Sequence, residues 1–164
     1  MSVIRGKVWK FGDDVDTDAI SPSGYPGGEV RKHVLEVINP KFPQEVKAGD
    51  IIVAGSNFGC GSSRETAPAL LKGLGVAGIV AESFARIFFR NAIAIGLPII
   101  SCPRVSDSFA EGDELEFDIA EAKVTNVTQK KTLDAQPLPE EMQEVLSKGG
   151  IVPMLKEIAR MDAR

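Results

Sequence analysis

The residues best suited to chemistry lie in a glycine-rich stretch, residues 55–65, which reads GSNFGCGSSRE. Two adjacent serines, Ser62 and Ser63, stand directly before Arg64. A short apolar segment precedes the stretch and a helical pattern follows it, so we expect backbone N–H groups and the positive end of a helix dipole to face the loop. The Arg64 guanidinium adds a planar fork that matches a carboxylate. The stretch therefore predicts an anion-binding loop between a strand and a helix.

This loop does not match the commoner phosphate, dinucleotide or hydrolase motifs. A Walker loop has lysine after its last glycine, where this chain has Ser62, and the third glycine of a dinucleotide fingerprint would fall on Arg64. A nucleophile elbow centred on Ser63 would have glycine in place of Glu65. The loop is suited to bind an anion, but it is neither a nucleotide-binding motif nor the nucleophile motif of ordinary hydrolases.

A structural explanation of the serines stays open. Ser62 and Glu65 have the spacing of a capping box, in which two side chains satisfy free N–H groups at the start of a helix. Three glycines in seven residues exceed what a cap requires, and Gly59 and Gly61 indicate close backbone approach to a ligand. Adjacent serines allow one to cap the helix while the other faces a substrate.

The soft metal ligands of the chain are two cysteines, Cys60 and Cys102, and one histidine, His33. An iron–sulfur cubane takes three or four thiolates, and structural zinc takes four Cys or His ligands. We therefore expect this chain to bind no metal by itself, so that any metal in the chemistry arrives on a partner. We interpret Cys60 as a packing residue and His33 as a surface residue, and a disulfide is not expected in a reducing compartment.

The composition bounds the class of protein. The chain has 164 residues, of which 43% are hydrophobic and 26% charged, as in an ordinary globular protein of one domain spanning residues 1–164. Its net charge of −4 gives no basic surface for nucleic acid, and no window is apolar enough to cross a membrane. The first residues lack the apolar run of a signal peptide, so we expect a cytoplasmic protein.

Strand and helix patterns alternate through the middle of the chain. Apolar runs predict strands at residues 51–55, 78–82 and 98–102, and helical spacing predicts helices at residues 64–72 and 84–95. Such alternation is typical of a βαβαβ unit with parallel strands.

The segments before and after this unit do not continue the alternation of strand and helix patterns. Residues 8–12 predict a strand, and residues 29–38 have helical spacing. Alternating residues 114–119 predict a strand that pairs with residues 123–127, and residues 140–147 predict a helix before a short helical tail. The expected fold is an α/β domain with a parallel βαβαβ core and additional antiparallel edge strands.

Three separated motifs carry a family resemblance. They are DTDAI at residues 16–20, GCGSSRE at 59–65 and SFARIFFRN at 83–91. Together they closely resemble the small subunits of 3-isopropylmalate dehydratase, a family that includes homoaconitase and 2,3-dimethylmalate dehydratase small subunits and the swivelling C-terminal domain of aconitase. The likeness extends from about residue 6 to residue 150. It implies a swivelling β/β/α domain.

The resemblance also implies an activity, a partner and a cofactor. In this family a large subunit holds a [4Fe–4S] cluster, and the small subunit completes the active site of a hydro-lyase in a heterodimer or heterotetramer. The reaction interconverts 2- and 3-isopropylmalate in leucine biosynthesis. The matching positions make Ser62 the base, Ser63 and Arg64 the groups that bind substrate and support that base, and Asp18 a member of the active-site network.

The resemblance implies a small di- or tricarboxylate substrate, which in family members is selected by the loop after the DTDAI motif. Here that loop is residues 21–28, which offer Ser21 and Tyr25 as substrate contacts. They would act beside the backbone of Gly59 and Gly61 in the stretch at residues 55–65, which we call the serine loop. It contains no arginine, and Arg31 matches the carboxylate-binding arginine of aconitase only after a one-residue adjustment. The resemblance thus favours a substrate with an apolar variable group, such as isopropylmalate or dimethylmalate, over homoaconitate.

Two further arginines and one further function remain as alternatives. Arg86 and Arg90 are four residues apart on a predicted helix and share a face. A structural or solvated role is the more common one for such residues, and a subunit interface or an anion path is the other. The alternative function is a stand-alone module whose Ser62–Arg64 loop binds a carboxylate or phosphate without chemistry.

Overall fold

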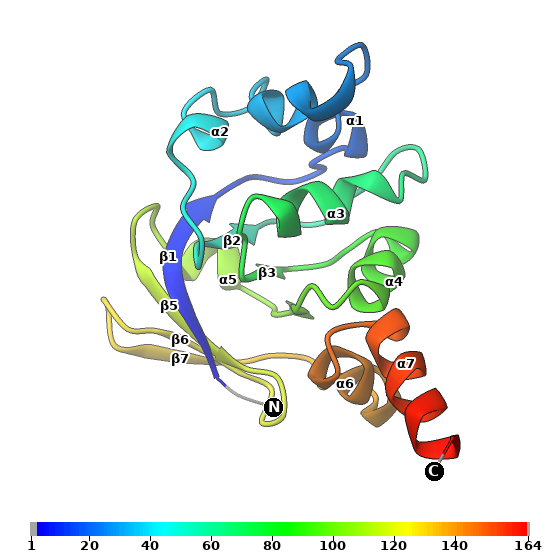
Figure 1. Cartoon of the computed structure of the whole chain (residues 1–164). Helices are drawn as coiled ribbons and strands as arrows, with labels where there is room; N and C mark the ends of the chain where they lie inside the picture. Colours follow the sequence, from blue (N-terminus) through cyan, green and yellow to red (C-terminus); the bar gives the residue numbers. More distant parts are fainter. Residues whose placement is uncertain (1–2, 164) are drawn as a thin grey trace.

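A computed structural model describes residues 3–163 (Figure 1). Its seven-stranded sheet has the order β4-β3-β2-β1-β5-β6-β7. In chain order the strands are β1 (Ile4–Lys10), β2 (Ile51–Ala54), β3 (Gly78–Ala81), β4 (Ile99–Ser101), β5 (Glu114–Asp118), β6 (Lys123–Asn126) and β7 (Lys131–Asp134).

Most of the helices lie in three groups along the molecule. The helices are α1 (Thr17–Ile20), the 3-10 helix η1 (Gly27–His33), α2 (Phe42–Glu45), α3 (Thr66–Gly73), α4 (Arg86–Ala94), α5 (Val105–Ser108), α6 (Glu140–Ser147) and α7 (Ile151–Asp162). Figure 1 shows α1 and α2 at one end, α3 and α4 beside the parallel strands, and α6 and α7 at the other end. Helix α5 lies against the strands β2 and β3. No helix in the described part of the chain is long and apolar enough to cross a bilayer.

The first four strands form the parallel half of the sheet. Ile51 of β2 stands opposite both Val8 of β1 and Gly78 of β3, and Ile79 of β3 stands opposite Ile99 of β4. Every residue of β2 and β3 is buried, as is usual for parallel strands covered on both faces. Helices α3 and α4 connect these strands in turn, which confirms the predicted βαβαβ unit.

Strand β1 also begins the antiparallel half, because its other edge pairs with β5. Strand β6 pairs with β5 and with β7, and β5 alternates between half-buried residues and the buried Leu115 and Phe117. The predicted pair of strands at 114–119 and 123–127 is thereby confirmed. The sequence does not predict β7, a largely exposed edge strand whose only apolar residue is Leu133. The expected fold class, α/β with a parallel core and antiparallel edge strands, is confirmed.

The helix predicted over residues 29–38 is confirmed as far as His33, where it is a 3-10 helix, and is wrong beyond that residue. Helix η1 ends at His33, and Leu35 adopts a left-handed conformation with φ +58°. The Leu35 N–H donates to the Ala19 carbonyl at 2.8 Å, and Leu35 is fully buried whereas Val37 is 81% exposed. This tertiary anchor of Leu35 overrides the helical spacing of the apolar residues. Farther along the chain, the predicted helix at 140–147 and the helical tail are confirmed as α6 and α7.

Candidate active site

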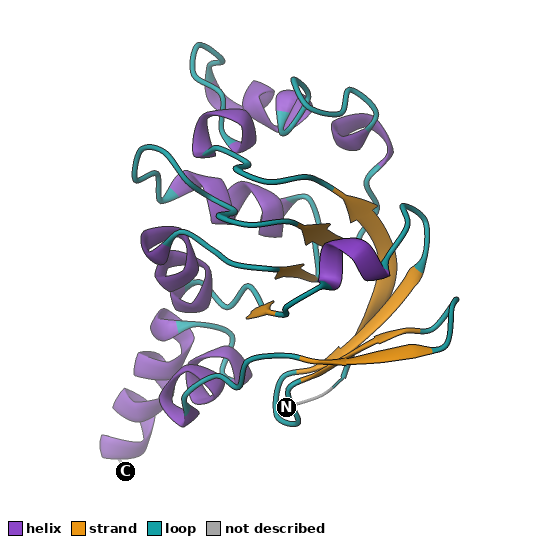
Figure 2. Ribbon diagram, turned by 180° about the vertical axis from the view of Figure 1, so that it is seen from behind, coloured by secondary structure: helices purple, strands orange, loops and turns teal. Residues whose placement is uncertain are grey.

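Three loops meet where the parallel strands β1, β2 and β3 end. The Thr17 N–H donates to the Cys60 carbonyl at 2.8 Å, and the Ala85 N–H donates to the Phe58 carbonyl at 3.0 Å. Isolated β-bridges reinforce both junctions. Figure 2 shows the arrowheads of the parallel strands pointing to the side from which the loops lead into the helices. The DTDAI, GCGSSRE and SFARIFFRN motifs are therefore brought together at one edge of the sheet.

Two glycines of the serine loop are required by their neighbours. Gly59 and Gly61 have φ values of +84° and +89°, in the left-handed region that favours glycine. A Cβ atom on Gly59 would lie 2.3 Å from the Phe88 ring, and one on Gly61 would lie 2.6 Å from Asp16 Oδ2. The backbone of each glycine thus lies close to a side chain of the protein itself. Both glycines also line the pocket described below.

The capping-box explanation of Ser62 is wrong. Helix α3 begins at Thr66, two residues later than predicted, and its N-cap residue Glu65 has helical backbone angles and makes no side-chain cap hydrogen bond. The Ser62 hydroxyl instead points to Asp18, with an Oγ–Oδ1 distance of 3.5 Å. The Ser62 carbonyl accepts a hydrogen bond from the Thr17 hydroxyl at 2.7 Å. Ser62 is consequently held by the DTDAI segment, and its hydroxyl does not cap helix α3.

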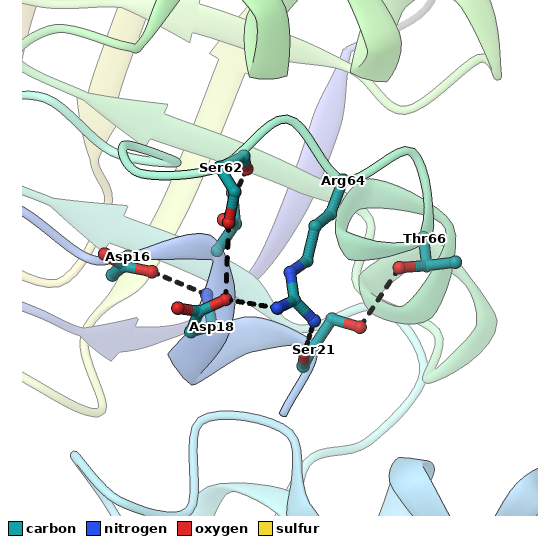
Figure 3. A network of polar contacts seen from close by, with 7 residues as sticks. Asp16, Asp18, Ser21, Ser62, Arg64 and Thr66 are labelled. Carbon is teal, nitrogen blue, oxygen red and sulfur yellow. Dashed lines mark hydrogen bonds and ion pairs between the residues drawn. The ribbon is translucent and has the colours of Figure 1, made fainter. Parts of the chain in front are cut away.

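Arg64 links the serine loop to Asp18 in α1 and to Ser21, the residue that follows α1 (Figure 3). Its Nη2 atom lies 2.7 Å from Asp18 Oδ1, and its Nη1 atom donates to the Ser21 carbonyl at 3.1 Å. Asp18 is itself oriented, because its N–H donates to Asp16 Oδ1 at 2.6 Å in the cap of α1. The Ser21 hydroxyl contacts the Thr66 hydroxyl at 3.1 Å. Arg64 is thus fixed at two of its five N–H donors.

An open pocket of about 280 Å³ lies over this network. Its polar wall comes from the serine loop and Thr17, and its apolar wall comes from the start of α4. The lining residues are Thr17, Gly59, Gly61, Ser62, Ser63, Arg64, Ala85, Arg86, Ile87, Phe88 and Asn91. The backbone N–H groups of residues 61–64 donate no hydrogen bond to any other residue in the described range 3–163. The pocket is therefore lined by residues that carry hydroxyl and guanidinium groups, and the N–H groups of the loop beside it have no protein acceptor.

The other predicted site residues lie apart from this pocket. The Tyr25 ring stacks on the His33 ring, with centroids 3.9 Å apart and planes 15° apart, and the His33 Nδ1 contacts Glu36. His33 is thus half-buried in a contact, rather than the plain surface residue that the sequence predicted. Arg31 donates to the Gly73 carbonyl at 2.7 Å, at the far end of α3. Ser21 reaches the pocket only through its carbonyl contact with Arg64.

The two thiols are poorly suited to metal binding or nucleophilic chemistry. Burial, together with nearby Asp16 and Asp14, raises the pKa of the Cys60 thiol. Burial raises the pKa of the Cys102 thiol to about 11, and both cysteines are free. Within residues 3–163 no three His, Cys, Asp or Glu side chains come together as a metal site. An iron–sulfur cluster does not fit the thiols that this chain offers.

Sequence reasoning missed three contributors to the site. Thr17 lines the pocket and holds the Ser62 carbonyl, Asp16 orients Asp18, and Asn91 lines the pocket from α4. The Asp-x-Asp spacing at the start of α1 is a usable signal for Asp16, since aspartate is a common N-cap residue. Asn91 ends the SFARIFFRN motif, but the motif does not show that this residue lines a pocket, because only the fold brings α4 to the serine loop.

Comparisons with known proteins relate the whole chain to one family. The aconitase C-terminal domain family matches residues 22–104. The isopropylmalate/citramalate isomerase small subunit of Methanocaldococcus jannaschii is 52% identical over 160 residues, covering 95% of each chain. A 3-isopropylmalate dehydratase small subunit of Methanopyrus kandleri is 51% identical over 158 residues, which is 94% of this chain and 93% of the other.

A solved structure gives the same result. The crystal structure of 3-isopropylmalate dehydratase from Methanocaldococcus jannaschii superposes with a TM-score of 0.90 at 40% identity, covering 99% of this chain and 98% of the other. Fold and site thus define the class of aconitase-type C-terminal domains. Within that class, the chain belongs to the family of 3-isopropylmalate dehydratase small subunits, which are subunits of a hydro-lyase.

Proposed function

We propose that the chain supplies one half of a hydro-lyase active site, in which Ser62 is the base that takes a proton from a substrate carbon. Loss of that proton and of the hydroxyl group on the neighbouring carbon leaves a C=C bond and releases water. Rehydration in the opposite orientation gives the isomeric hydroxy acid. The observation that carries the proposal is that Ser62 and Arg64 line an open pocket and both contact one carboxylate, that of Asp18, which does not itself line the pocket.

Serine is a weak base unless its alkoxide is stabilised. The surroundings of Ser62 are suited to that task, because Arg64 and the unused N–H groups of residues 61–64 place positive charge and donors beside the loop. Ser63 and the glycines Gly59 and Gly61 belong to the same wall, where a substrate carboxylate meets hydroxyl and N–H donors. Asp18 holds Arg64 in place, and its carboxylate orients the Ser62 hydroxyl.

The proposal includes a partner. The relatives are small subunits, which implies a large subunit, and we propose that this large subunit carries a [4Fe–4S] cluster. Cys60 and Cys102 do not offer a cluster site, so the cluster ligands must belong to the other chain. When bound there, the cluster supplies Lewis-acid chemistry at the substrate hydroxyl. We further propose that the chain is one swivel-type domain and works in the cytoplasm.

The proposed substrate is isopropylmalate. Relatives are named for isopropylmalate and citramalate, both of which are dicarboxylates with an apolar group. The loop at residues 21–28 fits this class because it carries Tyr25 and no arginine, and because Arg31 is occupied at Gly73. Dimethylmalate has the same chemical character. Homoaconitate has a third carboxylate, for which this loop provides no cation.

Reconstitution tests the proposal. The chain is combined with a cluster-bearing large subunit under anaerobic conditions, and the unsaturated acid is followed by its ultraviolet absorbance. Isopropylmalate, citramalate, dimethylmalate and homocitrate are compared by kcat/KM. The proposal predicts turnover, with isopropylmalate preferred. A complex that assembles but turns over none of these acids, yet binds carboxylate or phosphate, would favour the non-catalytic binding module instead.

A further inference from the structure

The charges around the pocket do not balance without Arg86. The Arg64 guanidinium is paired with the Asp18 carboxylate at 2.7 Å. A second carboxylate, Asp16, lies against Gly61, so that a Cβ atom there would be 2.6 Å from its Oδ2. Neither carboxylate lines the pocket, but both lie directly behind the serine loop. They offset the positive charge of Arg64, so that without Arg86 the site is unfavourable for a substrate that carries two negative charges.

Arg86 is the first residue of α4 and lines the pocket from the wall opposite the serine loop. Among residues 3–163, no carboxylate oxygen lies within 4.0 Å of its guanidinium, in contrast to Arg64. Its neighbours in the lining, Ala85, Ile87 and Phe88, are apolar. A guanidinium without an internal partner beside an apolar wall binds a carboxylate more strongly than one in open water, because less solvent screens the pair.

We propose that Arg86 is a further substrate-binding residue, which binds one carboxylate of the dicarboxylate substrate while the serine loop and Arg64 bind near the reacting carbon. This inference rests on the proposed function. It explains why the pocket has a second cation although Arg64 is largely occupied by protein groups. It also assigns the apolar side chains Ile87 and Phe88 to the face that meets the substrate's apolar group.

The chain offers a matched control in Arg90. It lies one turn farther along α4, it is also exposed, and it does not line the pocket. We compare Arg86→Gln, Arg86→Lys and Arg90→Gln in the complex with the cluster-bearing large subunit. Arg86→Gln is expected to raise KM by about 10- to 100-fold, the usual loss for a charge-assisted bond to a ligand, and Arg86→Lys to recover part of it. Arg90→Gln is expected to stay within about twofold of the wild type.

A second substrate identifies the group that Arg86 contacts. Esterification of the carboxylate remote from the reacting carbon removes its charge, so the penalty of Arg86→Gln is expected to fall to about twofold with this monoester. Calorimetric titration of isopropylsuccinate, a dicarboxylate that has no hydroxyl group to lose, into the assembled complexes measures binding without turnover. It is expected to show the same ranking of the three variants.

The outcomes separate three explanations. Equal kinetics of Arg86→Gln and Arg90→Gln in an active complex would overturn this inference alone. A loss of activity that follows weaker association with the large subunit, measured by calorimetry of the two chains, would overturn it in favour of an interface role. A wild-type complex that neither turns over nor binds a dicarboxylate would instead contradict the proposed function itself.

Discussion

Asp18 forms an ion pair with Arg64, which lines the pocket; the Arg64 Nη2 atom lies 2.7 Å from Asp18 Oδ1. The same oxygen lies 3.5 Å from the Ser62 hydroxyl. The Asp18 side chain is 60% exposed, and exposed ion pairs contribute at most about 1 kcal/mol to stability. The pair is therefore better explained by the position it gives to Arg64 and Ser62 than by its contribution to folding.

This relationship predicts a variant that loses activity and keeps its fold. Asp18→Asn removes the charge that holds the Arg64 guanidinium, so kcat/KM is expected to fall by about 10- to 100-fold. The free energy of unfolding, measured with urea, is expected to change by less than about 1 kcal/mol. Asp107→Asn is the control, because Asp107 is exposed and lies outside the pocket lining. Equal activity of the two variants would contradict a positioning role of Asp18.

Gly61 predicts a coupled loss of stability and activity. In Gly61→Ala the new Cβ would lie 2.6 Å from Asp16 Oδ2 at a φ of +89°, so Asp16 must move away from the cap of α1. Unfolding is expected to become about 1–3 kcal/mol easier, and the displaced Asp18 is expected to lower kcat/KM. Gly12→Ala is the matched control, since nothing lies within 4 Å of its Cβ position, its φ is not positive and it does not line the pocket. A neutral Gly61→Ala in the urea and kinetic measurements would contradict this packing argument.

The stacked pair of Tyr25 and His33 predicts a change in substrate preference. Their ring centroids are 3.9 Å apart, and the contact of His33 with Glu36 holds the imidazole in place. In His33→Ala the Tyr25 side chain loses its support, so the kcat/KM ratio of isopropylmalate to citramalate is expected to shift by roughly 2- to 10-fold. His33→Phe keeps an aromatic surface and is expected to preserve the ratio. An unchanged ratio in His33→Ala would show that Tyr25 does not contribute to substrate choice.

Asp113 predicts the acid sensitivity of the fold. Hydrogen bonds from the Ala110 N–H, then from Asn126 and Gln129, lower the pKa of this carboxyl. A folded-state pKa below the unfolded value of about 3.9 means that Asp113 stabilises the protein above that pH, and that this stability is lost as the pH falls further.

Urea unfolding from pH 7 to pH 3 measures this effect. Asp113→Asn is expected to be less stable at pH 7 by about 1–3 kcal/mol, because an ionised acceptor is lost. It is also expected to lose less stability than the wild type between pH 5 and pH 3, whereas Asp107→Asn should follow the wild type. Parallel pH profiles of all three proteins would contradict the role assigned to Asp113.

The regular core was predictable from sequence because its signals are local. The apolar runs that became β2 and β3 are buried on both faces, so neighbouring residues in the chain share one environment. The segment around Leu35 was not predictable, because a hydrogen bond to Ala19 fixes its left-handed backbone. Strand β7 was missed for a related reason, since its pairing with β6 depends on the register of a polar edge.

The site was predictable in its parts but not in its arrangement. The serine loop and Arg64 stand out by composition, and the family resemblance gives Asp18 a role. That Glu65 rather than Ser62 is the N-cap of α3 depends on where the helix begins, a boundary that local patterns define poorly. Arg86 and Asn91 enter the pocket only because the fold places α4 beside the loop.

The most direct test of the central claim is the activity of Ser62→Ala in the complex with the cluster-bearing large subunit. Ser56→Ala is the control, because Ser56 lies in the same loop, is exposed and does not line the pocket. If Ser62 is the base, kcat for isopropylmalate falls by about 10²- to 10⁴-fold in Ser62→Ala, with assembly of the complex unchanged, and stays within twofold in Ser56→Ala. A fully active Ser62→Ala complex would contradict the assignment.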